Sequence, residues 1–139
     1  MFLAHEERFG GRNMIETVLT EALSHYLDVN IARYKLVATN LANIDTPRYR
    51  ARDLDFRSEL RRAHIAESGA AGAFSLTDFA PVARPVRGLM ERPDGNNVSV
   101  ERESLLLAET QVKFNLGVQL LKDQFHLVSL AINSGGSTS

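Results

Sequence analysis

Cysteine and tryptophan are both absent from this sequence of 139 residues. Without cysteine, the chain has no disulfide framework, no thiolate metal ligand and no cysteine nucleophile. Long apolar runs are absent too: the start, MFLAHEERFGGRNM, holds only the short run from Phe2 to Ala4, and no window approaches the ~20 apolar residues of a membrane span. We therefore expect neither a cleaved Sec signal nor membrane insertion.

An excess of either sign of charge is absent as well, because 16 basic and 17 acidic residues leave a net charge of −1. A nucleic-acid partner requires a concentrated positive face. The run RYRAR (48–52) is basic, but Asp45, Asp53 and Asp55 surround it and cancel much of its field. We therefore predict no nucleic-acid partner.

Spacings typical of metal sites and of common enzymes are missing. HExxH, GxSxG, P-loop and dinucleotide fingerprints do not occur. Asp45, Asp53 and Asp55 could form a carboxylate cluster, but general acid–base work needs a pocket that shifts a carboxylate pKa. The neighbouring Arg50 and Arg52 favour simple ion pairing on a surface. We predict that the protein is not an enzyme and that it holds no metal or cofactor. The four histidines, which lack ligand spacing, are His5, His25, His64 and His126.

A first long helix is predicted from the spacing of apolar residues between about Met14 and Ala42. They recur every three or four positions without glycine or proline, as on one face of an α helix. Asn43 can take the left-handed conformation that ends a helix, and Pro47 pushes Thr46 into an extended conformation. We predict a helix over 14–43 with interface residues Leu19, Leu23, Leu27, Tyr34, Val37 and Leu41.

A second long helix is predicted over 98–133. The preceding Asp94-Gly95-Asn96-Asn97 is a turn signal, and Ser99 can cap the helix. From Phe114 the apolar residues step by 4, 3, 4, 3 and 4, which is heptad spacing. The predicted interface residues are Leu107, Phe114, Val118, Leu121, Phe125, Val128 and Ile132. A second stripe remains on the same helix: Leu106, Leu116, Leu120, Leu127, Leu130 and Ala131.

The middle of the chain, 44–97, is predicted to hold a turn and a loop-rich insertion. Ser58 to Glu67 could form a short helix, and SGAAGA (68–73) has the composition of a linker. Three prolines follow in 74–93 and disfavour a central strand, so we expect at most short β pieces, such as one weak hairpin.

The two ends are expected to lie outside the helices. Residues 1–13 have the composition of a flexible leader, with Gly10-Gly11 before the first periodic segment, and either Met1 or Met14 could be the functional start. Residues 134–139 are expected to be a disordered tail.

These elements predict a mainly α fold, with two long terminal helices pairing as an antiparallel coiled-coil-like hairpin in one helical domain. Each helix can bury only one stripe against the other. An ordinary hairpin core therefore accounts for one stripe per helix and leaves the second stripe of the C-terminal helix uncovered. Contiguous exposed leucine favours association with further copies or with partners.

The stretch ATNLANIDTPRY (38–49) resembles the signature of bacterial flagellar basal-body rod proteins, a helix that ends in SNxANxxTPGY. RARDLDF (50–56) resembles the KARDxDF extension of the family's proximal-rod members, and DGNNV (94–98) resembles the start of their DGNNVxxExE entry to the C-terminal helix. The family usually has glycine where this chain has Arg48, which leaves the left-handed backbone there open. The matched signature residues are Asn40, Ala42, Asn43, Asp45, Thr46, Pro47, Tyr49, Asp53 and Phe56.

The resemblance implies a structural subunit of the proximal rod in the flagellar basal body. Such subunits leave through the flagellar type III export apparatus and polymerise in the periplasm through their terminal helices, which builds the torque-transmitting drive shaft for motility. The implied partners are further copies, other rod subunits, the adaptor between rod and membrane ring, and the export apparatus. On the residues alone, two other functions stay open: a soluble helical-hairpin adaptor or chaperone, and a small enzyme that uses the 45–57 loop.

Overall fold

The computed structural model describes residues 6–67 and 80–135, and the side chains of 18–62 and 80–134 among them. Two long helices account for most of the described chain. The elements in chain order are α1 (Glu6–Ala42), β1 (Arg52–Asp53), α2 (Phe56–Glu67), β2 (Arg84–Pro85) and α3 (Val100–Gly135).

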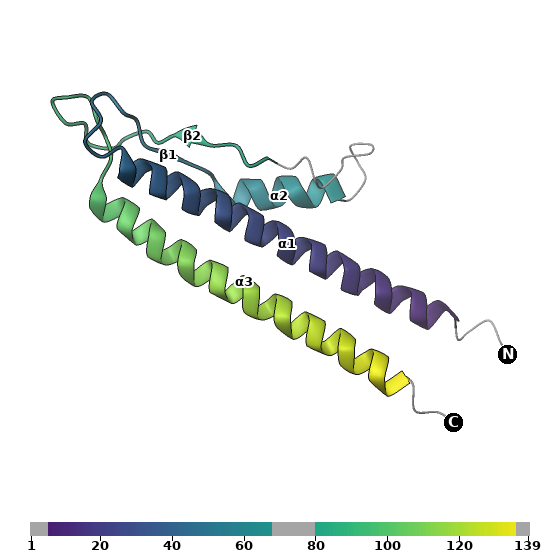
Figure 1. The fold of residues 1–139 in the computed structure, drawn as a ribbon. Helices are drawn as coiled ribbons and strands as arrows, with labels where there is room; N and C mark the ends of the chain where they lie inside the picture. Colours follow the sequence, from purple (N-terminus) through teal and green to yellow (C-terminus); the bar gives the residue numbers. More distant parts are fainter. Residues whose placement is uncertain (1–5, 68–79, 136–139) are drawn as a thin grey trace.

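Helices α1 and α3 lie side by side, and the start of α1 and the end of α3 lie at the same end of the pair (Figure 1), so the two helices run antiparallel. Within the connection between them, α2 and the short β pair lie against α1 (Figure 1), and Asp53 and Phe56 also contact side chains of α3. The prediction of a mainly α fold with two long terminal helices is confirmed. The coiled-coil-like packing of the two helices stays a prediction.

Helix α1 is longer than predicted, whereas α3 has the predicted length but starts and ends two residues later. α1 begins at Glu6, so residues 6–13 of the predicted leader are part of the helix, which starts eight residues before Met14. Gly10 and Gly11 weaken a helix by about 1 kcal/mol each relative to alanine but keep their N–H donors, so they do not break it. α3 ends at Gly135, two residues beyond the predicted end. The linker predicted at 68–73 and residues 136–139 of the predicted tail lie outside the described residues.

Helix α2 confirms the predicted short helix and begins two residues earlier, at Phe56. Asp55 caps its N-terminus, because Oδ1 accepts a hydrogen bond from the Ser58 N–H (3.1 Å) and Oδ2 accepts one from the Ser58 hydroxyl (2.7 Å). These hydrogen bonds from Ser58 lower the pKa of Asp55 below its ordinary value.

The two strands pair antiparallel, with Arg52 opposite Pro85 and Asp53 opposite Arg84. The Val86 N–H donates to the Ala51 carbonyl at 2.9 Å and extends this pairing. In the described part of 74–93, residues 80–93, the β pairing joins two distant segments and is not the expected local hairpin. Pro85 lacks an N–H donor, which suits the edge of a two-stranded ribbon.

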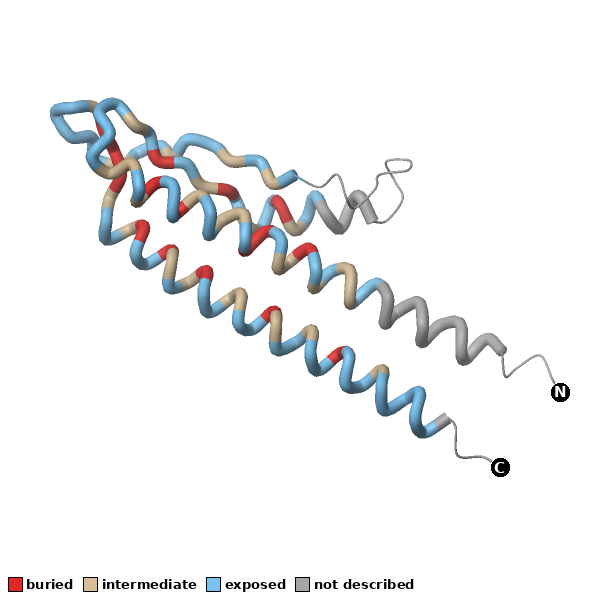
Figure 2. Tube along the Cα trace, in the orientation of Figure 1, coloured by how far each residue is buried: buried red, intermediate tan, exposed pale blue. Residues whose placement is uncertain are grey.

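Buried residues gather on the facing sides of α1 and α3 and where the middle segment meets α1 (Figure 2). The apolar core is small: Val29, Val37, Ala51, Leu54, Val98 and Leu106. Polar side chains are buried beside it, and Asn30, Asn40, Asn96, Glu103 and Thr110 are at most 1 % exposed. Asn40, Asn96 and Glu103 make internal hydrogen bonds, so polar contacts specify this core as much as apolar ones do.

Candidate functional site

The candidate site is the joint, the turn at the end of α1 (residues 43–49) together with the segment that enters α3 (residues 94–98). Asn43 Nδ2 donates to the Thr39 carbonyl (2.8 Å), and the Thr46 hydroxyl contacts Asn43 Oδ1 (3.2 Å). The Thr46 N–H donates to the Asn43 carbonyl at 3.1 Å. These contacts close the turn where the sequence predicts it. Four predicted signature residues, Ala42, Asp45, Thr46 and Pro47, are exposed here.

Asn96 closes the joint from the other side of the sequence. Its Nδ2 donates to the carbonyls of Asn43 (2.9 Å), Ile44 (3.0 Å) and Thr46 (2.8 Å), while its Oδ1 accepts from the Val98 N–H (2.8 Å). All three carbonyls belong to the turn that follows Ala42, the last residue of α1. One fully buried amide therefore holds this turn and fixes the entry to α3.

Arg48 has a φ of 62° and is the one non-glycine residue with positive φ in the described chain. The left-handed backbone that glycine favours is therefore kept here by arginine. The Arg48 N–H donates to the Asp94 carbonyl (2.9 Å), which holds the residue in place. Gly95, itself at φ +83°, lies so close that a Cβ there would be 3.2 Å from Arg48 Cγ.

Asn40 and Glu103 form the buried centre of the contact between α1, the joint and α3. Asn40 Nδ2 donates to Glu103 Oε2 (2.9 Å) and to the Arg52 carbonyl (2.8 Å), and Asn40 Oδ1 accepts from the Arg52 N–H (3.1 Å) and the Tyr49 hydroxyl (3.2 Å). Burial raises the pKa of the Tyr49 hydroxyl, against the opposing charge of Arg52, so Tyr49 stays a donor. All the hydrogen-bonding groups of the Asn40 amide are used.

Asp53 ties three elements together. Arg33 of α1 donates to it through Nε (3.0 Å to Oδ1) and Nη2 (3.1 Å to Oδ2), and Arg102 of α3 donates through Nη2 (2.9 Å to Oδ2). Burial alone would lower the pKa of Arg33, but the hydrogen bonds and charge of Asp53 raise it overall. The expected surface pairing with neighbouring arginines is wrong for Asp53, whose side chain is only 15 % exposed.

Phe56, the last signature residue, begins α2 and pins it to the helix pair. Its ring meets Tyr26 of α1 edge to face, with ring centroids 5.3 Å apart and planes at 87°. The Lys113 ammonium of α3 lies 4.7 Å from the centre of the same ring. Lys113 also donates to Glu109, and this hydrogen bond lowers the pKa of the Glu109 carboxyl.

The predicted interface residues of α1 are only partly covered within one chain. Val37 is buried, but Leu19 and Tyr34 are 44 % and 46 % exposed. The other three are half-buried: Leu23, Leu27 and Leu41.

On α3 the contact with α1 is centred on a face that the apolar pattern does not mark. Gly117 lies where an added Cβ would be 2.8 Å from Leu27 Cδ2 and 2.9 Å from Tyr26 Cδ1, so the helices approach closely there. Phe125 and Ile132 from the predicted stripe are 58 % and 70 % exposed. The other five predicted residues flank the contact and are half-buried: Leu107, Phe114, Val118, Leu121 and Val128. The buried residues are Glu103, Leu106, Thr110, Gly117 and Gln124.

Sequence reasoning assigned no site role to Asn96, Asn97 and Gly117. The DGNN run indicates a turn, but not that Asn96 reaches back to α1, nor that Asn97 Oδ1 accepts the Ala51 N–H (2.7 Å). The lone glycine inside a long apolar helix was the available signal for a close approach of backbones.

The joint is a set of fixed polar contacts and not a cleft. Asp53 and Asp55 are engaged with guanidinium groups and a helix N-terminus. In the described ranges, no three histidine or acidic side chains are placed to share a metal ion. None of the described helices combines the length and the hydropathy of a membrane span.

Two long antiparallel helices with exposed apolar side chains, joined at one end by buried polar contacts, define a mainly α protein built on a helix pair. No family model matches the sequence, but curated relatives do. They include "Flagellar basal body rod protein FlgB" from Salmonella typhimurium (32 % identical, 70 % of this chain and 80 % of the relative), Borrelia hermsii (30 %, 79 % and 93 %) and Cereibacter sphaeroides (33 %, 72 % and 82 %). The chain belongs to the FlgB family of flagellar basal-body rod proteins.

Proposed function

We propose that this protein is a subunit of the proximal rod that leaves through the flagellar type III export apparatus and polymerises through α1 and α3 into the torque-transmitting shaft. Family membership supports the coarser statement, a structural protein of the flagellar basal-body rod. The proposed partners are further copies, other rod subunits, the adaptor between rod and membrane ring, and the export apparatus.

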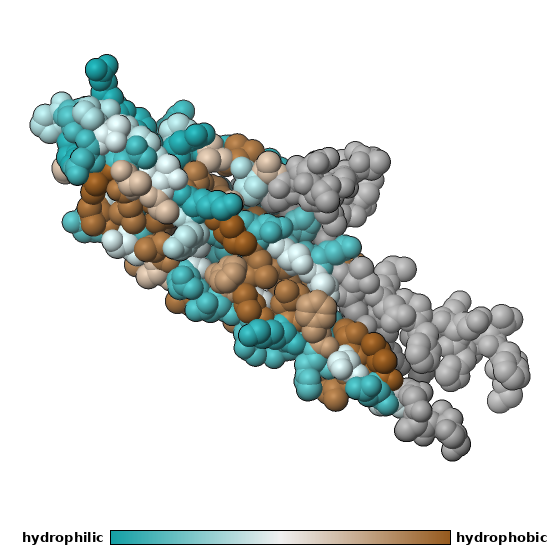
Figure 3. All heavy atoms as spheres, viewed as in Figure 1, coloured by the Kyte–Doolittle hydropathy of each residue, from teal (hydrophilic) through white to brown (hydrophobic). Residues whose placement is uncertain are grey.

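One observation carries the assembly step: α3 leaves a large apolar area open along its length. Apolar surface also extends along the helix pair in Figure 3. Fully burying one leucine or phenylalanine side chain contributes about 1.5–3 kcal/mol, so covering several of them with neighbouring helices would drive association. The large apolar side chains exposed on α3 are Val100, Leu105, Val112, Leu116, Leu120, Phe125, Leu127, Leu130 and Ile132.

The joint supports this role because it gives the subunit a fixed shape while the helices carry the contacts. Asp53 and Asn40 connect the turn, α1 and α3 through charge-assisted and buried hydrogen bonds. We further propose that α1 and α3 pair as a coiled-coil-like hairpin, and that neighbouring subunits add helices to the open faces of that pair.

A strain that lacks the gene tests the function. Returning the intact gene should restore swimming, and isolated basal bodies should contain the chain in the rod fraction. As a matched control, Ser104→Ala alters an exposed position of α3 outside the apolar set and should restore both. A deletion strain that still builds rods and swims would remove the rod function altogether.

Amide exchange of the dilute chain tests whether order in the helices depends on assembly. We expect fast exchange in the outer halves of α1 and α3, where neighbours would supply the missing cover, and slower exchange near the joint. Uniformly slow exchange along both helices in a monomer would instead favour a free-standing helical adaptor.

A further inference from the structure

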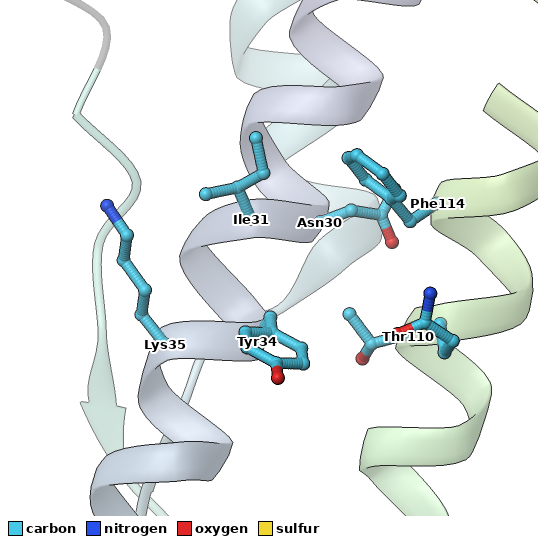
Figure 4. Close-up of a pocket in the computed structure, with 7 residues that line it drawn as sticks. Asn30, Ile31, Tyr34, Lys35, Thr110 and Phe114 are labelled. Carbon is cyan, nitrogen blue, oxygen red and sulfur yellow. The ribbon is translucent and has the colours of Figure 1, made fainter. Parts of the chain in front are cut away.

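A pocket of ≈ 320 Å³ opens between α1 and α3, and its lining side chains come from both helices (Figure 4). Ile31 and Tyr34 from α1 and Phe114 from α3 form its apolar walls. Ile31 and Tyr34 are 41 % and 46 % exposed. Because the pocket has a volume of ≈ 320 Å³ and its walls are partly exposed, side chains of another molecule can enter it.

The floor of this pocket is polar and incomplete. Asn30 and Thr110 are each 1 % exposed and belong to the pocket lining. Asn30 Nδ2 donates to the Tyr26 carbonyl (2.8 Å), whereas Asn30 Oδ1 and Thr110 Oγ1 have no hydrogen-bond partner in the described chain. Buried polar atoms are rarely left without partners. An occupant of the pocket should therefore bring a hydrogen-bond donor as well as apolar surface.

A complementary surface lies on the other side of α3. Successive residues turn by about 100° along a helix, so Leu116 lies about 200° around the helix from Phe114. This surface, here called the leucine strip, borders Glu109 and Lys113, which contact α1 and α2. The leucine strip consists of Leu105, Val112, Leu116, Leu120, Leu127 and Leu130, all at least 45 % exposed.

The charged and polar groups of the two surfaces match. Lys35 lines the pocket and has no carboxylate partner within the described residues. Asp123 is exposed within the leucine strip, where it accepts a hydrogen bond from Gln119 Nε2 (2.9 Å). Gln119 lies at the edge of the leucine strip, about 60° around α3 from Leu116, and its amide is a donor for Asn30 Oδ1 if the pocket opens onto that buried atom. The strip thus offers an anion to the pocket's cation and a donor to its acceptor.

We propose that the pocket of one subunit receives the leucine strip of α3 from a second copy of this chain, with Asp123 facing Lys35 and Gln119 facing Asn30. Pairing pocket with pocket would bring two lysines together, and pairing strip with strip would bring two aspartates together, which is unfavourable. The contact is therefore head-to-tail and leaves one pocket and one strip free to continue the assembly. This inference rests on the proposed rod function and assigns the residues of one of its contacts.

Two variants of the full chain test the direction of the contact by sedimentation across a concentration series. Leu116→Glu disables the strip, and Tyr34→Glu disables the pocket. Both positions are exposed, so helicity by circular dichroism should match the wild type. Each variant alone should stay monomeric, whereas their mixture should form a 1:1 heterodimer that does not grow, because each partner retains one working surface.

Each other pattern has a defined meaning. Dimers of the Leu116→Glu variant alone would show pocket-to-pocket pairing, and dimers of the Tyr34→Glu variant alone would show strip-to-strip pairing. If both variants associate as strongly as the wild type, the pocket holds only water and the proposal is overturned. A wild-type chain that stays monomeric would overturn it too. Swimming of the complemented deletion strain is measured separately. If the chain restores rods and one of these results is found, the proposed contact is wrong and the rod function stands.

A charge exchange gives a second measurement that does not depend on the apolar substitutions. Lys35→Asp and Asp123→Lys should each weaken association by roughly 3- to 10-fold, as expected for a partly exposed ion pair replaced by like charges. The double variant should recover most of the wild-type association. If the double variant does not recover association, Lys35 and Asp123 do not face each other and the assigned pairing is wrong.

Discussion

Asn40 in α1 donates a hydrogen bond of 2.9 Å to the carboxylate of Glu103 in α3, and at most 1 % of either side chain is exposed. An ionised carboxylate is stable in such a place only when its oxygens are hydrogen-bonded. Arg102 donates to the other oxygen of Glu103. The first turn of α3 is thereby fixed to the last turns of α1, and the joint lies between them.

Asn40→Leu should lower the free energy of unfolding by about 2–4 kcal/mol, because it removes hydrogen bonds from a buried carboxylate and from the backbone of Arg52. Urea unfolding measures this change. Thr39→Ala, at the exposed neighbouring position, is the control and should stay within about 0.5 kcal/mol of the wild type. Equal effects at both positions would contradict the buried role of Asn40.

Asn96→Asp should destabilise the chain more than Asn96→Ala does. The alanine variant removes one of two donors from each of three joint carbonyls and takes the side-chain acceptor from the buried Val98 N–H, which costs about 1–3 kcal/mol. The aspartate variant keeps the shape but turns an acceptor toward the carbonyls of Asn43, Ile44 and Thr46. Urea unfolding of both variants gives the order, and a more stable aspartate variant would show that Asn96 does not act as the donor.

The helical period predicted both long helices and the end of α1, since apolar spacing and the run Asn43 to Pro47 act locally. The same pattern misplaced the centre of the α1–α3 contact. An apolar pattern places polar residues such as Asn40 and Thr110 on the solvent side of a helix. Gly117 has no side chain and so does not contribute to the pattern. Their burial depends on the distant joint, where Asn96 meets α1, and no local period encodes that meeting.

Arg48→Gly should leave the free energy of unfolding unchanged or raise it slightly. A non-glycine residue in the left-handed region is strained by about 1 kcal/mol or more, and relief of that strain offsets the entropy that glycine loses on folding. Arg48→Val is the matched contrast, because a β-branched residue is poorly accommodated at φ 62°. Thermal unfolding should rank glycine at or above arginine and valine clearly below. A valine variant as stable as the wild type would exclude strain at this position.

Gly117→Ala should destabilise the chain although alanine favours a helix by about 1 kcal/mol. The new Cβ would lie 2.9 Å from the Tyr26 ring, which is itself held by Phe56, so the helices must move apart. Overpacking of this kind costs about 1–3 kcal/mol. Asn115→Ala, at an exposed position two residues away, should be neutral or stabilising in the same urea titration. A stabilised Gly117→Ala variant would mean that α1 and α3 do not approach closely at this point.

Phe125→Asp should separate folding from assembly, because the Phe125 side chain is 58 % exposed in the single chain. The isolated variant should keep the helicity and urea midpoint of the wild type. Its incorporation into rods should fail, since a charge would enter an apolar contact between helices and lose its hydration. Isolated basal bodies and swimming in the deletion strain provide the measurement. Ser129→Asp places the same charge one turn away at an exposed polar position and should be incorporated. If Phe125→Asp is incorporated as well as Ser129→Asp, this part of α3 contacts no neighbouring subunit.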